Sequence, residues 1–365
     1  MPNDIEATRR AQAATLLGES AFHKQKLDAL LITNLHNVRY LSGFTGSNAA
    51  LLLYADGRAR LYTDPRYTVQ SRQQVTCDIA IAKGPLTKPV LADINRARLR
   101  HVGFEQDNLT VGQFESISKN LPNRAKLEPA SGMIERLRMV KDEAEIALIR
   151  KSVQTNSKAL EAALKRLKVG MTEAEFAAEI DYQNRKGGAE APAFDTIVAA
   201  GERAALPHAH PGPAKIGPGM LLIDMGAFEA GYASDMTRMA HIGVASPKYK
   251  RAYKAVLEAQ LAAIDAVKAG AKTSAVDRAA RRTLKAHNLE KEFVHSTGHG
   301  LGLEIHEPPR IGRKDQTKLE AGMAITIEPG VYIEGWGGIR IEDTVLVTAT
   351  GCEILTPTSK ELRQI

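Results

Sequence analysis

The segment MLLIDMGAFEAGYASDMTRMA, residues 220–240, decides the architecture of the second half of the chain. Apolar residues surround two aspartates, Asp224 and Asp235, and the pair Glu229-Ala230 separates the two arms. The pattern predicts a β-hairpin. If the turn centres on Glu229-Ala230, the aspartates face each other directly, with about 5 Å between their Cβ atoms. Carboxylates buried among apolar residues need a partner, and a shared cation can be that partner.

A second hairpin is predicted in AITIEPGVYIEGWGGIRIEDTVLV, residues 324–347, around the turn EGWG. Its two arms carry Glu328 and Glu342, so the arrangement of two acids among apolar residues is repeated. Arg340 precedes Glu342 by two positions and therefore projects from the same strand face. A cation there could orient a carboxylate or meet an anionic group of a substrate.

Between the hairpins lies HSTGHGLGLEIHE, residues 295–307, with three histidines and two glutamates. The helical zinc motif H-E-x-x-H is excluded, because His306-Glu307 is followed by two prolines that would break a helix. Each carboxylate alone is more typical of a salt bridge. Taken together, four acids and one histidine nearly balance two divalent cations, and such a donor set favours manganese over a thiolate-type zinc centre. Two adjacent cations acidify a shared water, which indicates metal-assisted hydrolysis.

The remaining pattern predicts an α+β protein of two domains. Strands are expected at 49–55, 59–64, 78–82 and 101–105, which indicates a small α/β domain over residues 1–132. Residues 133–365 alternate helices with hairpins, so we expect two similar halves facing each other. The helices are expected at 142–170, from the capping box Thr172/Glu175 to Gly187-Gly188, from Ser246-Pro247 to Gly270, and at 274–287.

The composition excludes several classes of protein. Two cysteines in 365 residues provide neither a disulfide framework nor a thiolate metal site. No apolar run approaches a membrane span, and the N-terminal segment lacks the apolar core of a secretory signal, so we expect a cytoplasmic protein without a membrane partner. The net charge is +7, but apart from short clusters such as Arg281-Arg282 the basic residues are scattered and not interleaved with aromatics. We therefore expect a solvated surface and no nucleic-acid partner.

Several separated motifs together resemble the pita-bread peptidase family, which includes methionine aminopeptidase, Xaa-Pro aminopeptidase (aminopeptidase P) and Xaa-Pro dipeptidase (prolidase). They are ALPHAH (205–210), IDMGAFEAGYASDMTR (223–238), HSTGHGLGLEIHEPP (295–309), ITIEPGVY (325–332) and GGIRIED (337–343). The segment NVRYLSGFTGSNAALLL (37–53) resembles the creatinase-like N-terminal domain of bacterial Xaa-Pro peptidases. The resemblance implies a creatinase-like α/β domain followed by a pita-bread catalytic domain with pseudo-twofold halves.

The resemblance also implies roles for individual residues. Five would bind two metal ions, most suitably Mn²⁺, with Co²⁺ or Zn²⁺ as alternatives: Asp224, Asp235, His299, Glu328 and Glu342, of which Asp235 and Glu342 would bridge. Glu328 would also shuttle protons, and His208 and His306 would steady the substrate carbonyl and the tetrahedral intermediate. His295, Tyr332 and Arg340 would line the pocket for the proline ring. His210 and His241 have no counterpart and are interpreted as structural or surface residues.

The substrates implied by the resemblance are peptides with proline in the second position. The resemblance of the N-terminal segment favours aminopeptidase P activity, and prolidase activity is the alternative. Creatinase chemistry is disfavoured because all five metal ligands are present, and the complete ligand set also disfavours a non-catalytic binding protein on the same fold. A homodimer is expected by the same comparison.

Overall fold

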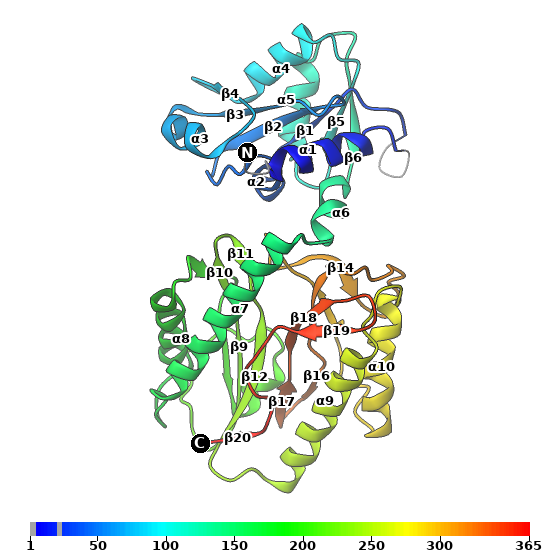
Figure 1. Ribbon diagram of the computed structural model, residues 1–365. Coiled ribbons are helices and arrows are strands. Elements are labelled where there is room, and N and C mark those ends of the chain that lie inside the picture. Colours follow the sequence, from blue (N-terminus) through cyan, green and yellow to red (C-terminus); the bar gives the residue numbers. More distant parts are fainter. Residues whose placement is uncertain (1–4, 20–23) are drawn as a thin grey trace. The chain divides into compact units, whose positions relative to one another are not determined.

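The computed structural model of the chain describes residues 5–19 and 24–365 (Figure 1). Residues 1–4, at the start of the N-terminal segment discussed above, and residues 20–23 lie outside the described residues. The chain divides into two compact units, Met1–Arg138 and Met139–Ile365. No helix among the described residues is both long and apolar enough to cross a membrane.

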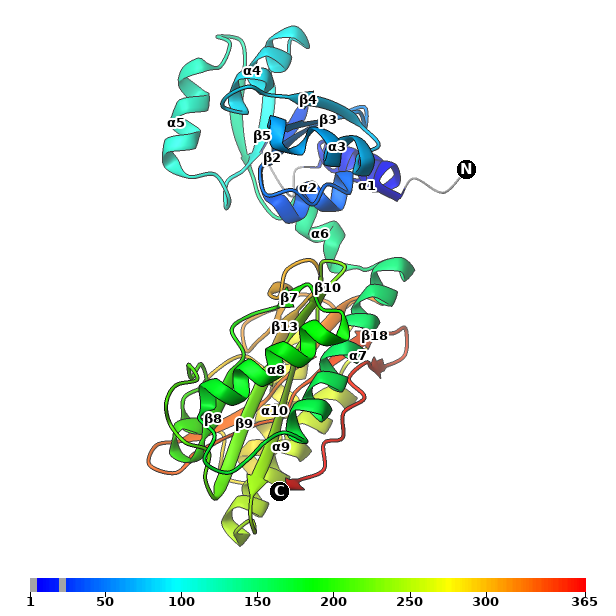
Figure 2. The same cartoon turned by 90° about the vertical axis from the view of Figure 1, so that its left-hand side faces the viewer.

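The N-terminal unit is a six-stranded sheet with helices on both faces (Figures 1 and 2). The strand order is β4-β3-β2-β1-β5-β6, and α4 and α5 cover one face while α1 and α2 cover the other. All four predicted strands are confirmed, whereas β1 and β6 were not predicted. The elements are α1 (Ile5–Leu16), β1 (Ala29–Ile32), α2 (Leu35–Ser42), β2 (Ala49–Tyr54), β3 (Ala59–Thr63), η1 (Pro65–Tyr67), α3 (Thr68–Gln74), β4 (Asp78–Ile81), α4 (Thr87–Arg96), β5 (His101–Glu105), α5 (Val111–Asn120), β6 (Lys126–Ala130) and α6 (Met133–Met139).

The C-terminal unit contains two helix pairs and two larger sheets that are antiparallel except for the parallel pairing of β12 with β20, and this arrangement confirms the predicted alternation. The first half comprises α7 (Glu143–Leu164), α8 (Glu173–Gly187), β7 (Ala191–Pro192), β8 (Ile197–Ala200), η2 (Gly201–Ala205), β9 (Gly219–Met225), β10 (Ala227–Glu229), β11 (Tyr232–Ala233) and β12 (Met236–Ile242). The second half comprises α9 (Pro247–Asp265), α10 (Thr273–Ala286), β13 (Gly298–Gly300), β14 (Glu307–Ile311), β15 (Ala324–Ile327), β16 (Gly330–Ile333), β17 (Gly337–Arg340), β18 (Asp343–Val347), β19 (Cys352–Ile354) and β20 (Arg363–Gln364).

The two halves repeat the same local geometry, as the pseudo-twofold prediction requires. The amide of Gly170 donates to the carbonyl of Ile216 in the first half, and the amide of Gly270 donates to Leu319 in the second. Both glycines have positive φ, 93° and 83°, immediately before the second helix of their pair. This equivalence lies in backbone geometry more than in side chains, so the sequence shows it only weakly.

Two helices end earlier than predicted, for the same reason. Helix α7 ends at Leu164 and α9 at Asp265, six and five residues before the glycines that are predicted to end them. Each glycine amide bonds to a distant loop carbonyl instead of the carbonyl four residues back. The glycines therefore belong to the turn that follows each helix. The predicted capping box of Thr172 and Glu175 at the start of α8 is confirmed.

The register of the first hairpin differs from the prediction. Ala230 (φ 49°) and Gly231 (φ 77°) form the turn, because a two-residue hairpin turn of this kind needs positive φ at both central positions and glycine supplies one without strain. The shift places Thr237 opposite Asp224. Asp235 therefore lies diagonally from Asp224, and the predicted direct pairing of the two aspartates is wrong.

The alternation along β9 turns Asp224 toward the interior of the unit. Leu221 and Ile223 pack in one apolar cluster with Leu160 of α7 and Phe176 of α8. Leu222 points to the opposite face and packs with β15 and α9. Asp224 follows Leu222 by two positions and therefore shares that face, which is turned toward the second half.

The second hairpin is confirmed, but its turn is one residue shorter than the predicted EGWG, because Ile333 pairs with Gly337. Ile327 pairs with Asp343 in the β15–β18 ladder, and Gly330 pairs with Arg340 in the β16–β17 ladder. Both pairs obey the same register, so Glu328 and Glu342 lie opposite each other in the gap between the ladders.

Candidate metal centre

A cavity of about 850 Å³ gathers the residues singled out in the sequence. Nine of the ten line it: His208, Asp224, Asp235, His295, His299, His306, Glu328, Arg340 and Glu342. The tenth, Tyr332, contacts the group through hydrogen bonds to His295 and Arg340. The cavity thus draws side chains from segments more than 130 residues apart in the chain.

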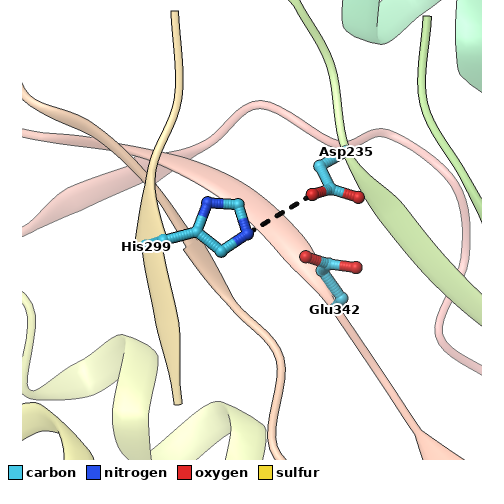
Figure 3. Close-up of side chains that lie close together, drawn as sticks. All are labelled: Asp235, His299 and Glu342. Atoms are coloured by element: carbon cyan, nitrogen blue, oxygen red, sulfur yellow. Dashed lines mark ion pairs between the residues drawn. The ribbon is translucent and has the colours of Figure 1, made fainter. Parts of the chain in front are cut away.

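At its centre, Asp235, His299 and Glu342 offer one ligand atom each within 4.8 Å of one another (Figure 3). His299 Nε2 lies 3.5 Å from Asp235 Oδ2 and 3.6 Å from Glu328 Oε1. The three residues come from three different segments: the break between β11 and β12, strand β13, and the residue before β18. A single cation could contact all three.

His299 is held in the form that a metal requires. Its Nδ1 lies 3.0 Å from the carbonyl of Gly300, so this nitrogen carries the proton and Nε2 keeps its lone pair toward the acids. Burial lowers the pKa of His299 to about 4, so the ring is neutral at physiological pH. Gly298 allows strand β13 to lie close to strand β15, since a Cβ at position 298 would lie 1.9 Å from the carbonyl oxygen of Thr326.

The acids of the centre lie close together, and the nearby positive charge balances their negative charges only in part. Burial, together with repulsion from Glu342 and Asp224, raises the pKa of Asp235 well above its usual range. Burial and repulsion from Glu328 do the same for Glu342. Burial raises the pKa of Glu328 to about 7, although Arg340 opposes the shift. Without further positive charge this cluster would retain protons, so it has the electrostatics of a site for cations.

Asp224 has one oxygen satisfied and one not. Arg340 donates from Nη2 to Asp224 Oδ2 at 2.5 Å, in a pair that is almost fully buried. Asp224 Oδ1 is buried and has no hydrogen-bond partner among the described residues. Buried polar atoms in native proteins nearly always have partners, so an unsatisfied carboxylate oxygen beside three potential ligands fits a metal ion.

Thr237 was not predicted and proves central to the geometry. Its hydroxyl donates to Glu342 Oε2 at 2.7 Å and accepts from Arg340 Nε at 3.0 Å. It could have been found from its position two residues after Asp235, on the same strand face.

A hydrogen-bonded chain connects the candidate proline pocket to the acids. His295 Nε2 lies 2.9 Å from the hydroxyl of Tyr332, and Arg340 Nη1 donates to that hydroxyl at 2.6 Å. Burial, aided by the charge of Arg340, lowers the pKa of His295 to about 4, and burial raises the pKa of Tyr332 to about 12. Both side chains are therefore uncharged at neutral pH, as suits the wall of an apolar substrate pocket.

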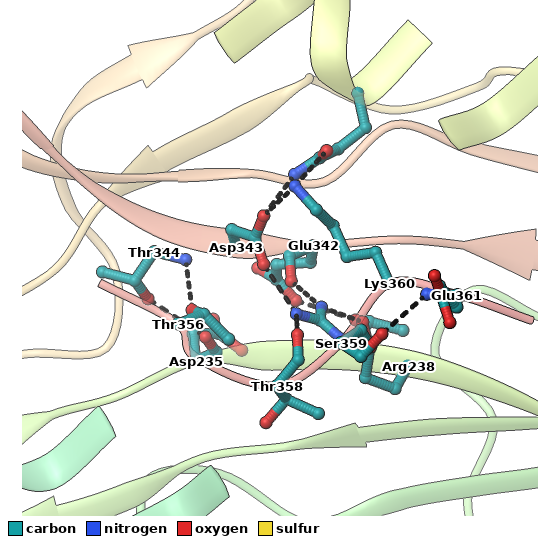
Figure 4. A network of polar contacts seen from close by, with 12 residues as sticks. Asp235, Arg238, Glu342, Asp343, Thr344, Thr356, Thr358, Ser359, Lys360 and Glu361 are labelled. Atoms are coloured by element: carbon teal, nitrogen blue, oxygen red, sulfur yellow. Dashed lines mark hydrogen bonds and ion pairs between the residues drawn. The ribbon is translucent and has the colours of Figure 1, made fainter. Parts of the chain in front are cut away.

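A buried polar network lies behind the acids (Figure 4). Arg238 donates to Asp343 Oδ1 and to the carbonyl of Thr358, each at 2.7 Å, and also to the carbonyl of Glu342. Lys360 Nζ contacts Asp343 Oδ2 at 2.6 Å. The network therefore fixes the backbone of Glu342 to the C-terminal segment.

The other histidines occupy distinct environments. The ring of His306 contacts the ring of His299 edge-on, with centroids 4.4 Å apart. Burial lowers the pKa of His306. His208 is exposed at the rim. His210, interpreted as a surface residue, is exposed but also lines the cavity. His241 is buried against Tyr249, outside the cavity.

Comparisons with known proteins point in one direction. Residues 147–349 match metallopeptidase family M24, and residues 19–140 match the creatinase/prolidase N-terminal domain. An Xaa-Pro dipeptidase from Pyrococcus horikoshii is 36% identical over 340 residues, covering 93% of this chain and 95% of that protein.

Solved structures agree with this match. An Xaa-Pro dipeptidase from Bacillus anthracis superposes with a TM-score of 0.94 at 36% identity, covering 99% of this chain and all of the other. An X-Pro aminopeptidase from Thermotoga maritima gives a TM-score of 0.87 at 36% identity, covering 93% and 98%. The two named activities differ, and the two identities are equal.

Proposed function

The chain belongs to metallopeptidase family M24, and from that premise we propose that this metallo-exopeptidase hydrolyses the bond between an N-terminal residue and a following proline, using two divalent metal ions. The observation that carries the proposal is the convergence of Asp235, His299 and Glu342 in a cavity that also holds Asp224 and Glu328. The printed names of the relatives support the Xaa-Pro substrate class.

We assign four acids and one histidine as ligands of the two ions. Asp235 and Glu342 would bridge, Asp224 would complete one site through its unsatisfied Oδ1, and His299 with Glu328 would complete the other. Oxygen-rich donor sets of this kind suit Mn²⁺, with Co²⁺ and Zn²⁺ as alternatives. When bound, such ions supply a hydrolytic nucleophile at neutral pH by acidifying water.

The remaining steps belong to the protein's own side chains. Glu328 accepts a proton from the attacking water and returns it to the leaving proline nitrogen, a role suited to a carboxylate that lines the cavity beside His299. His208 and His306, which both line the cavity, donate to the scissile carbonyl oxygen as charge develops on it. Thr237 and Arg340 hold Glu342 and Asp224 in fixed orientations throughout.

The proline ring would pack against His295 and Tyr332. Their hydrogen bond fixes both rings, and Arg340 fixes the tyrosine hydroxyl from the other side. A rigid pocket of this kind selects proline by shape. Binding also costs little conformational entropy, because no side chain of the pocket needs to be ordered when the substrate binds.

Peptide length is the open part of the substrate assignment. The N-terminal segment 37–53 favours an aminopeptidase P, but Arg310 on the cavity wall favours the dipeptidase. Arg310 is exposed, and its guanidinium has no hydrogen bond among the residues described. Asp315 is an acidic side chain close enough to interact electrostatically with it. An unengaged guanidinium in a peptide-binding cavity is suited to a free C-terminal carboxylate, which a dipeptide presents beside its proline.

The test is a steady-state comparison of Xaa-Pro with Xaa-Pro-Yaa peptides on the metal-loaded protein and on Arg310→Gln. A dipeptidase predicts preference for Xaa-Pro and a rise in KM of about tenfold or more in the variant, as for loss of one charged hydrogen bond. Turnover of the longer peptides, with Arg310→Gln unaffected, would return the assignment to aminopeptidase P. No chelator-sensitive cleavage of either substrate would refute the proposed function. The expected homodimer can be checked on the same preparation by sedimentation.

A further inference from the structure

Helix α10 has one face lined with basic residues that the proposed function does not use. Six residues of the helix are spaced three or four apart and so share one side of it: Ser274, Asp277, Arg278, Arg281, Arg282 and Lys285. Together with Glu290 and Arg313 they line a separate cavity of about 380 Å³. The cluster Arg281-Arg282, which looked isolated in the sequence, is thus part of a continuous basic surface.

The charges on this surface are not balanced from within. Five basic side chains face two acidic ones. Asp277 is committed to Arg281 at 2.8 Å and to the hydroxyl of Thr297 at 2.9 Å, and Glu290 lies 3.7 Å from Arg313. In the part of the chain that the structure describes, Arg278, Arg282 and Lys285 have no acidic partner.

Like charges at this spacing oppose helix formation. Arg278 and Arg282 are four residues apart, as are Arg281 and Lys285, and such pairs destabilise a helix unless a counter-charge lies between them. The bottom of the cavity is formed by buried groups, Ser274, Asp277 and Arg281, while the other cations stand exposed around it. A recess with three exposed cations that lack an acidic partner at its rim is suited to an anion with several oxygens.

Arg281 connects this recess to the candidate proline pocket. Its guanidinium donates to the carbonyl of Phe293 at 2.9 Å and to the carbonyl of His295 at 2.5 Å, and it stacks on the ring of Phe293 with 4.1 Å to the centroid. His295 in turn contacts Phe293 edge-on and Tyr332 by its hydrogen bond. A change in the position of the Arg281 guanidinium would therefore act directly on the backbone of His295, which belongs to the wall of the candidate pocket.

We propose that the basic face of α10 binds a small multivalent oxyanion of the sulfate or phosphate class, and that Arg281 transmits its binding to the segment bearing His295. The site is distinct from the metal centre and shares no residue with it. Its effect on peptide hydrolysis rests on the proposed function, whereas the binding itself does not.

Sulfate is the probe, because it is divalent and does not strip divalent metals from the protein. Calorimetric titration of the metal-loaded protein is run at constant ionic strength, with chloride exchanged for sulfate, so that general screening stays the same. We expect saturable binding of one sulfate per chain. Arg278→Glu combined with Arg282→Glu should weaken it by about tenfold or more.

The matched control is Lys165→Glu combined with Lys168→Glu. These lysines are exposed in the loop after α7, in the other half of the unit, and the change in net charge is the same. The control should bind sulfate as the unaltered protein does. Equal loss in both double variants, or no saturable binding in the unaltered protein, would overturn the proposal.

The coupling to the pocket has its own test. Sulfate should change KM for an Xaa-Pro dipeptide without changing metal content. Arg281→Lys keeps the charge but loses the forked contacts to two carbonyls. In that variant sulfate should still bind, and its effect on KM should disappear. An unchanged effect in Arg281→Lys would refute the role of Arg281, while a chain without peptidase activity but with normal sulfate binding would refute only the proposed function.

Discussion

The buried pair of Arg238 and Asp343 offers a quantitative test of what holds the metal centre in place. Arg238 is replaced by methionine, which fills similar volume without charge. The substitution removes the donors to Asp343 and to the carbonyls of Thr358 and Glu342, and leaves Asp343 with Lys360 and Gln260.

The magnitude follows from burial. The side chains of Arg238 and Asp343 are 6% and 0% exposed, and removing one member of a buried pair costs about 3–5 kcal/mol. Lys360 still compensates Asp343, so we expect about 3 kcal/mol. For a unit of this size each kcal/mol lowers Tm by about 2–4 °C, which gives about 6–12 °C.

Arg363→Met is the matched control. Arg363 also pairs with a carboxylate, that of Glu161, which it contacts through both terminal nitrogens, but the two side chains are 37% and 43% exposed. An exposed pair is worth at most about 1 kcal/mol, so Tm should fall by no more than about 4 °C.

Calorimetry of both variants, with metal content measured by atomic absorption, provides the assay. Arg238→Met should also lose metal, because the backbone of Glu342 is no longer anchored. Equal Tm shifts for the two arginine variants would refute the argument from burial. A large Tm shift with full metal content would refute the link between this network and the metal centre.

The remaining predictions concern the site and the N-terminal unit. His299→Ala should lose metal and activity together, whereas His306→Ala should lose activity and keep its metal; parallel metal loss in atomic absorption would contradict these roles. Chelation should abolish hydrolysis and lower Tm, since ions present at a hundred times Kd stabilise the folded state by about 2.7 kcal/mol; a Tm insensitive to chelator would argue against tight binding. Burial raises the pKa of Glu105 to about 7 despite donors from Thr33, Asn34 and Asn37. The folded state then binds more protons than the unfolded state between about pH 4.5 and 7, so Glu105 makes stability fall as pH rises through that window and contributes no further change above it. Urea titrations across this range should show a smaller fall for Glu105→Gln; the same slope in both proteins would show that another group is responsible.

Much of the architecture could be predicted from short-range patterns. Alternating apolar residues located both hairpins, and Thr172 with Glu175 marked the start of α8. The errors have a common source, because glycines were interpreted locally. Gly170 and Gly270 satisfy their amides across the fold, and Gly231 belongs inside the turn that it was expected to follow.

The sequence by itself determined which residue types are available and which strand face each one takes, because side chains alternate along a strand with a period of two. It therefore indicated Asp224, Asp235, Glu328 and Glu342 as two pairs of acids among apolar neighbours. Only the tertiary structure decided how these pairs meet. The one-residue shift of the first turn moved Asp235 away from direct pairing with Asp224 and brought Thr237 opposite it. That shift allows Thr237 to connect Glu342 with Arg340, and Arg340 with Asp224. Contacts between segments more than 100 residues apart depend on how the two halves pack, and no local pattern in the sequence encodes that packing.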